Sequence, residues 1–152
     1  MREVPSTDLP PSLAAIREDF LELSVPDRLQ LLLEFSDTLP VVPEELIDPE
    51  AWERVEECQS PVFITVETKP DEVMVYATAP EEAPTTRGFA SILVQGLHGM
   101  TPDQVLAVPP DFPLQLGLQN AVSMLRLRGM SGMLWRIKRQ VEESLGRAGS
   151  PE

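Results

Sequence analysis

The sequence is poor in the side chains that hold metal ions and cross-link small folds. Its 152 residues include one cysteine, Cys58, and one histidine, His98. A single cysteine cannot form a disulfide within the chain, and one cysteine with one histidine cannot supply the ligands of a structural zinc site. The sequence therefore predicts no bound metal ion. It also predicts no iron–sulfur cluster held by this chain alone, because such clusters are held by several thiolates.

Several catalytic motifs are missing as well. The chain has no glycine-rich phosphate loop, no G-x-S-x-G turn and no H-E-x-x-H pair. Nucleotide binding and the common hydrolase reactions therefore have no support, and we expect no cofactor on the chain itself. His98 follows an apolar helical segment, where a hydrogen bond or a positive charge at the helix end is favoured over a role as general base.

Basic side chains are few. Lys and Arg number 12 against 25 Asp and Glu, which gives a net charge of −13. Phosphate backbones and anionic lipids repel such a chain, so we expect no nucleic-acid and no membrane partner. No apolar run reaches the ~18 residues of a spanning helix, and the first residues contain no apolar signal segment. We therefore expect a soluble, cytoplasmic protein.

The basic side chains are also unevenly distributed. Residues 1–84 carry 5 basic and 20 acidic side chains, whereas residues 85–152 carry 7 and 5. Five of the seven lie in a stretch without acids: Arg126, Arg128, Arg136, Lys138 and Arg139. Such a run is either a solvated helix face or a docking patch for one protein partner. We expect Arg136, Lys138 and Arg139 on the solvated face of the last helix.

Apolar periodicity and 16 prolines predict short, sharply bounded elements. Helices are predicted over 11–23 and from 25 to just before Pro40, with so short a connection that we expect them to pack as a hairpin. The acidic, proline-rich stretch 40–57 is predicted to be mainly irregular. Alternation of apolar and polar residues then predicts a β-hairpin over about 61–79.

Helical patterns resume in the second half of the chain. A helix is predicted over 85–97, and a capping box beginning at Thr101 opens a short helix to about residue 107. Apolar residues from Met130 to Leu145 recur at spacings of three and four, which predicts an amphipathic last helix.

This order of elements predicts an α+β fold, with a small antiparallel sheet formed from the hairpin over about 61–79 and helices packed on one face. A chain of this length fits one domain, 1–152. We expect its core over about 11–145 and flexible ends at 1–9 and 147–152.

Cys58 has polar neighbours on both sides, Glu57 before it and Gln59 and Ser60 after it. This context predicts a loop tip where the thiol is exposed at least intermittently. The thiol is either incidental or a nucleophile or carrier, because no second thiol is present to resolve a disulfide. Glu56 and Glu57 should raise the pKa of the thiol, so a reactive Cys58 needs a cation from elsewhere in the fold or from a partner.

Four stretches, in order, resemble the SufE/CsdE family of sulfur-acceptor proteins. They contain the Cys-Gln-Ser signature, a helix start with an Arg-Gly pair, a capped short helix, and an Arg-x-x-Gly stretch leading into the last helix: Val55–Ile64, Pro84–Ala90, Gly99–Leu106 and Arg126–Lys138. With the two N-terminal helices, the resemblance covers roughly residues 11–145. Glu57 differs from the family pattern, which commonly has glycine before the cysteine.

The resemblance implies a SufE/IscU-like fold and a role in sulfur transfer for iron–sulfur cluster assembly. It implies a pyridoxal-phosphate-dependent cysteine desulfurase as donor and activated partner, and a cluster scaffold as the next acceptor. By this resemblance Cys58 accepts the persulfide sulfur. Residues of its loop and of the partner interface are Gln59, Ser60, Glu82, Arg126 and Arg128. The alternative is a non-carrying adaptor or scaffold-like module of the same fold, and the sequence leaves a homodimer open.

Overall fold

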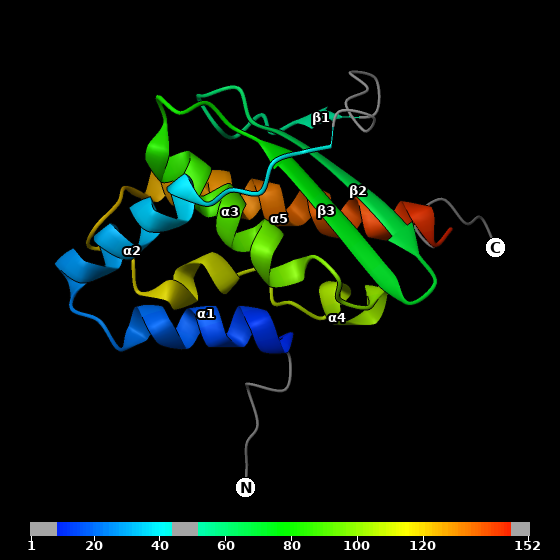
Figure 1. The fold of residues 1–152 in the computed structure, drawn as a ribbon, viewed down its shortest axis with the longest axis horizontal. Coiled ribbons are helices and arrows are strands. Elements are labelled where there is room, and N and C mark those ends of the chain that lie inside the picture. The colour runs from blue at the N-terminus through cyan, green and yellow to red at the C-terminus, as the bar shows by residue number, and fades with distance from the viewer. Residues whose placement is uncertain (1–8, 44–51, 147–152) are drawn as a thin grey trace, which may run out of the picture.

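The computed structural model describes residues 9–43 and 52–146 (Figure 1). The elements follow one another as α1 (Pro11–Leu21), α2 (Val25–Asp37), β1 (Glu53–Arg54), β2 (Phe63–Lys69), β3 (Glu72–Thr78), α3 (Pro84–Leu97), α4 (Pro102–Leu106), a 3₁₀ helix (Phe112–Leu116) and α5 (Met124–Ser144). The predicted α+β class is confirmed. Of the ends expected to be flexible, only Leu9 lies within the described residues, and it is buried.

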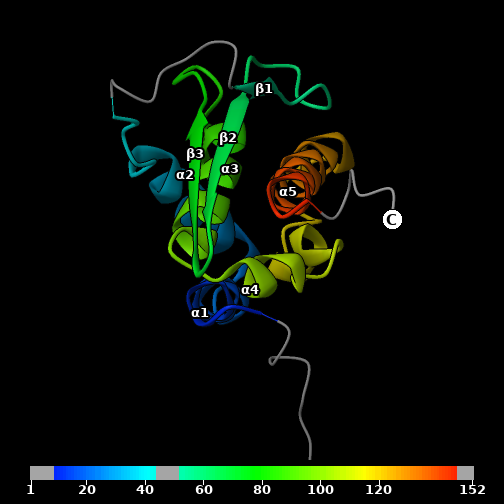
Figure 2. The ribbon, with the colours of Figure 1, turned by 90° about the vertical axis from the view of Figure 1, so that its right-hand side faces the viewer.

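The sheet is antiparallel, in the order β1-β2-β3. The predicted hairpin is confirmed: β2 and β3 pair from Phe63↔Thr78 to Lys69↔Glu72. Alternate residues are buried on one face, as the period of two predicts: Val62, Ile64, Val73, Val75 and Ala77. Helices α3 and α5 pack against β3 and β2 respectively, behind the same face of the sheet (Figures 1 and 2).

The third strand, β1, lies in the stretch predicted to be irregular. Glu53 pairs with Ile64, and Arg54 pairs with Phe63. Two charged residues carry no alternating apolar pattern, so nothing local indicated a strand there; the pairing is set by contact with β2. The prediction of mainly irregular chain therefore holds for residues 40–43, 52 and 55–57 and is corrected only for 53–54, whereas 44–51 lies outside the described residues.

Helix α3 is the centre of the molecule and is buried around most of its circumference from Gly88 onward. Both α1 and α2 pack on α3 rather than mainly on each other, so the predicted hairpin packing is corrected. Two glycines permit this approach. A Cβ atom on Gly88 would lie 2.5 Å from the carbonyl oxygen of Leu32, and one on Gly96 would overlap Cδ1 of Leu13.

The predicted start of α4 is confirmed, whereas α5 begins earlier than its apolar stripe predicts. The capping box of α4 is present, with Thr101 Oγ1 accepting from the Gln104 amide at 3.1 Å. The last helix, however, begins at Met124, because the hydroxyl of Ser123 accepts a hydrogen bond from the Arg126 amide at 3.3 Å. Arg126 and Arg128 therefore lie in the first turns of α5, not in a loop before it.

His98 has the hydrogen-bonded role that the sequence favoured. It is the C-terminal cap of α3, and its Nδ1 accepts a hydrogen bond from the Val75 amide at 3.1 Å. This contact covers part of the free edge of β3, where unpaired amides would otherwise face solvent.

Candidate functional site

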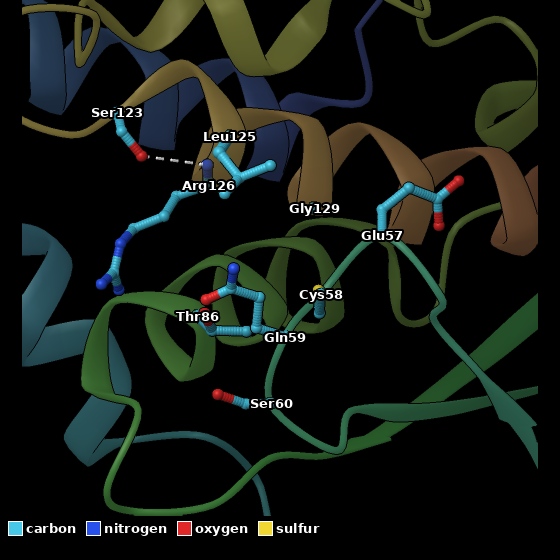
Figure 3. Close-up of a pocket in the computed structure, with 9 residues that line it drawn as sticks. All are labelled: Glu57, Cys58, Gln59, Ser60, Thr86, Ser123, Leu125, Arg126 and Gly129. Carbon is cyan, nitrogen blue, oxygen red and sulfur yellow. Dashed lines mark hydrogen bonds between the residues drawn. The ribbon is translucent and has the colours of Figure 1, made fainter.

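The loop that carries Cys58 connects β1 to β2. One backbone hydrogen bond closes its base, and a second forms the turn that ends at Cys58. The Val55 amide donates to the Val62 carbonyl at 2.9 Å, and the Cys58 amide donates to the Val55 carbonyl at 3.1 Å. This tight turn directs the thiol inward, onto α5 (Figure 3). Cys58 lies at the predicted loop tip but is only 6% exposed, so the thiol is buried in this structure, and its intermittent exposure stays a prediction.

A glycine on α5 makes room for the thiol. A Cβ atom on Gly129 would lie 2.9 Å from Cys58 Sγ. Any side chain at this position would therefore compete with the thiol for space. Because Gly129 has no side chain, the loop can pack directly against α5 and bury the sulfur there.

The thiol faces a pocket of about 220 Å³. Residues from the loop, α3 and α5 form its wall: Glu57, Cys58, Gln59, Ser60, Thr86, Ser123, Leu125, Arg126 and Gly129. In Figure 3 the side chain of Arg126 extends from α5 toward the Thr86 side of the pocket, away from Cys58. The pocket is large enough for several water molecules, at roughly 30 Å³ each, and hence for an additional sulfur atom on Cys58.

The structure brings most of the predicted site residues together. Gln59, Ser60 and Arg126 line the pocket with Cys58, and Glu82 lies beside Ser60 and Arg126 in an adjoining hollow. Arg128 is exposed and lines neither of these two hollows.

Burial dominates the chemistry of the thiol. It raises the pKa of Cys58 from 9.0 to about 11, with a further upward contribution from Glu57. Arg136 and Arg54 act in the opposite direction. The upward effect expected of Glu57 is thus present, Glu56 is not among the causes of the shift, and the cations that act on the thiol from elsewhere in the fold are Arg136 and Arg54. A thiol with this pKa is almost entirely protonated at neutral pH and is a poor nucleophile in the closed loop.

The basic residues expected on a solvated face are instead bonded to the protein. Arg136 is 7% exposed and pairs with Glu57 and Glu53. Arg139 pairs with Glu53 and Glu143. Lys138 Nζ donates to the carbonyl of Val108 at 2.5 Å. The prediction failed because α5 packs against the sheet and the loop with part of its charged face as well as its apolar stripe.

The sequence alone did not assign to the site four residues that shape it: Ser123, Leu125, Gly129 and Arg136. Two signals were present for them. Gly129 and Gly132 lie three residues apart in a helical pattern, which places two bare positions on one face. Ser123 precedes α5 at the position where serine commonly caps a helix. The pairing of Arg136 with Glu57 had no local signal, because the two residues are 79 positions apart.

Within residues 9–43 and 52–146, no cluster of three or more His, Cys, Asp or Glu side chains is arranged to hold a metal ion. In the same residues, no helix combines the length and apolar character needed to cross a membrane.

Comparisons with known proteins agree on one family. Residues 14–141 match the family model "SufE: Fe-S metabolism associated domain". The chain is 51% identical over 137 residues to a SufE-like protein of Mycobacterium tuberculosis, covering 90% of this chain and 95% of that protein. It is 31% identical over 101 residues to the "Cysteine desulfuration protein SufE" of Plasmodium vivax, covering 65% of this chain and 39% of that protein.

A solved structure has the same fold. It is the solution structure of a hypothetical protein from Thermus thermophilus, which superposes with a TM-score of 0.80 at 38% sequence identity. The match covers 91% of this chain and 98% of that one. The arrangement of sheet and helices is therefore shared over nearly the whole length of both chains.

Proposed function

The chain belongs to the SufE family, whose domain is associated with Fe–S metabolism, and from this premise we propose that it carries sulfur on Cys58. The observation that carries the proposal is the position of this thiol. Cys58 is the only cysteine of the chain, and it faces a pocket formed by three separate elements. A protein whose one thiol lies beside such a pocket is suited to hold a single sulfur atom.

The transfer needs no cofactor on this chain. The thiolate of Cys58 attacks the outer sulfur of a persulfide on the donor's cysteine. The donor's sulfur–sulfur bond breaks as a new one forms on Cys58, and the donor's cysteine leaves as thiolate, so no net oxidation occurs. Cys58 then holds the persulfide until a second acceptor attacks in the same way.

The donor that fits this chemistry is a pyridoxal-phosphate-dependent cysteine desulfurase, and the next acceptor is a cluster-assembly scaffold in the cytoplasm. The closed loop supports a partner-dependent reaction. Because the buried thiol has a pKa of about 11, it reacts slowly until the loop opens. Contact with the donor is expected to open the loop and to stimulate the donor by removing its sulfur.

Apolar and basic side chains at the pocket mouth provide the docking surface. Met124 and Leu125 are 52% and 50% exposed at the start of α5. Arg126 lies beside them and lines both hollows next to the loop. Exposed apolar residues next to a cation fit a protein surface that has an apolar patch and a carboxylate, since complementary charge sets the partner and the orientation.

Replacing Arg126 by alanine should therefore weaken binding of the desulfurase by about tenfold or more, because the cation at the pocket mouth is lost. The matched control is Arg128→Ala, which removes the same charge two residues away, outside both hollows. Titration of the desulfurase with each variant measures the affinity, and circular dichroism checks the fold. An equal or larger loss for Arg128→Ala would place the docking surface elsewhere on α5.

A second function, that of a non-carrying adaptor, is favoured by one observation. Cys58 is buried, and its pKa is raised, as in a structural cysteine that never reacts. An adaptor would bind and stimulate the desulfurase without receiving sulfur.

The two functions are separated by the intact mass of the chain after incubation with a cysteine desulfurase, pyridoxal phosphate and cysteine. Sulfur transfer predicts a mass increase of one sulfur atom per chain that a reductant removes. The control omits cysteine. Stimulation of the desulfurase without any such increase would support the adaptor and contradict the carrier.

A further inference from the structure

One buried arginine joins the Cys58 loop to α5 at two points. Arg136 Nη1 donates to Glu57 Oε1 at 2.6 Å, and Arg136 Nε lies 3.3 Å from Glu53 Oε2. Nη1 also donates to the carbonyl of Gly132 at 3.2 Å, one turn earlier in the same helix. Glu53 belongs to β1 at the base of the loop, whereas Glu57 immediately precedes Cys58. The same guanidinium therefore contacts both the fixed base and the tip of the loop.

The surface of α5 is shaped to receive the two residues at the tip. A Cβ atom on Gly129 would lie 2.9 Å from Cys58 Sγ, and one on Gly132 would lie 2.5 Å from Glu57 Oε1. Positions three and four apart share one face of a helix, so Gly129, Gly132 and Arg136 form a continuous strip. The Cys58 thiol lies against Gly129, and the Glu57 carboxylate lies against Gly132. The guanidinium of Arg136, one turn further along the helix, donates a hydrogen bond to that carboxylate.

The base of the loop has its own attachments, which do not involve Glu57. Arg139 pairs with Glu53, and Gln140 Nε2 donates to Glu53 Oε1 at 3.1 Å. Gln140 Oε1 also accepts from the Val66 amide at 2.9 Å. Movement of the loop tip away from α5 therefore breaks the Glu57–Arg136 pair and can leave the base in place. That pair is a polar contact between the tip and α5 that opening must break.

We propose that Arg136 is a positioning residue for the acceptor thiol, and that its ion pair with Glu57 holds the loop closed over Cys58 until a partner displaces it. The inference rests on the proposed function and adds a mechanism of control to it. Arg136 is buried, so release of Glu57 leaves its charge with Glu53 as the remaining carboxylate partner. A buried charge that loses one of its two carboxylate partners is destabilised, and this loss favours the closed loop in the isolated chain.

Two effects of Arg136 on the reactivity of Cys58 have opposite signs. The charged groups facing the thiol are Glu57 on the loop, Arg54 on β1 and Arg136 on α5. Removing the cation raises the pKa of the thiol in the closed loop, which by itself slows alkylation at neutral pH. Removing the ion pair exposes the thiol, which accelerates alkylation. The direction of the change thus separates a positioning role from a purely electrostatic one.

The test is alkylation of Cys58 by iodoacetamide in the isolated chain, without any desulfurase. Arg136→Gln and Glu57→Gln are each expected to accelerate the reaction about tenfold, which corresponds to about 1.4 kcal/mol in the opening equilibrium. Arg136→Lys keeps a cation near Glu57 and should restore most of the protection. Glu56→Gln is the matched control, because it removes the adjacent acidic charge, which belongs to neither ion pair of Arg136.

Hydrogen exchange gives a second readout that does not depend on the thiol pKa. In Glu57→Gln the Cys58 amide should exchange about tenfold faster, whereas the Val55 amide at the loop base should be unchanged. The inference is overturned if alkylation is slower or unchanged in a folded Arg136→Gln, or if Glu57→Gln behaves like Glu56→Gln in both measurements. Neither measurement involves sulfur transfer. The closing role of the ion pair can therefore be wrong while the proposed function is right, and the proposed function can be wrong while the closing role is right.

Discussion

Replacing Cys58 by serine is expected to abolish sulfur loading completely and, with it, the stimulation of the desulfurase. A hydroxyl cannot form a persulfide, and the chain has no other cysteine to take over. The substitution is nearly isosteric, and the serine can occupy the space beside Gly129, so the fold and the docking surface should remain. The expected result is a folded variant that binds the desulfurase, gains no sulfur in intact mass and leaves turnover at its basal rate.

The control for this experiment is Ser144→Ala, which changes an exposed serine at the end of α5, outside both hollows, and keeps the thiol. It should load sulfur to the same stoichiometry as the unmodified chain. Full stimulation by Cys58→Ser would mean that binding alone activates the desulfurase. In that case the adaptor function would stand and the carrier function would be wrong.

The second large effect concerns pH. Alkylation of Cys58 in the folded chain at pH 8 is expected to be about 100-fold slower than in the same chain unfolded in urea. The reason is that burial and Glu57 raise the thiol pKa from 9.0 to about 11, and only the thiolate reacts. The rate should continue to rise toward pH 11, whereas that of the unfolded chain should level off above pH 9. Equal rates in the two states would show that the loop is open in solution.

The same shift predicts how stability depends on pH. A raised pKa in the folded state means that folding favours the protonated thiol. The contribution of Cys58 to stability is therefore fully present below pH 9.0 and is lost as the pH rises toward about 11. Urea unfolding at a series of pH values should show this loss, and Cys58→Ser, which has no titrating thiol, should lack it.

Elements with a strong local pattern were predictable. The alternation over β2 and β3, the capping box of α4 and the apolar stripe of α5 each lie within one continuous segment. Helix ends and strand β1 were less predictable. Ser123 begins α5 earlier than its apolar stripe indicates, and Glu53 and Arg54 form a strand only because β2 lies beside them.

The candidate site was also predictable only in part. Cys58 could be found by counting, since one thiol must carry any cysteine chemistry, and the resemblance brought Gln59, Ser60 and Arg126 to it. The state of the thiol could not be found, because a polar neighbourhood in sequence suggests exposure. Two bare positions on a distant helix, at Gly129 and Gly132, instead allow the loop to bury it.

By itself, the sequence determined the α+β class, the hairpin, the family and the one residue available for thiol chemistry, because periodicity, motifs and residue counts are local properties of the chain. Tertiary structure alone decided that Cys58 is buried and that Arg136 bonds the residue before it. Burial and ion pairing depend on which segments meet in space, and Glu57 and Arg136 are 79 positions apart. No pattern within either segment encodes the hydrogen bond between them.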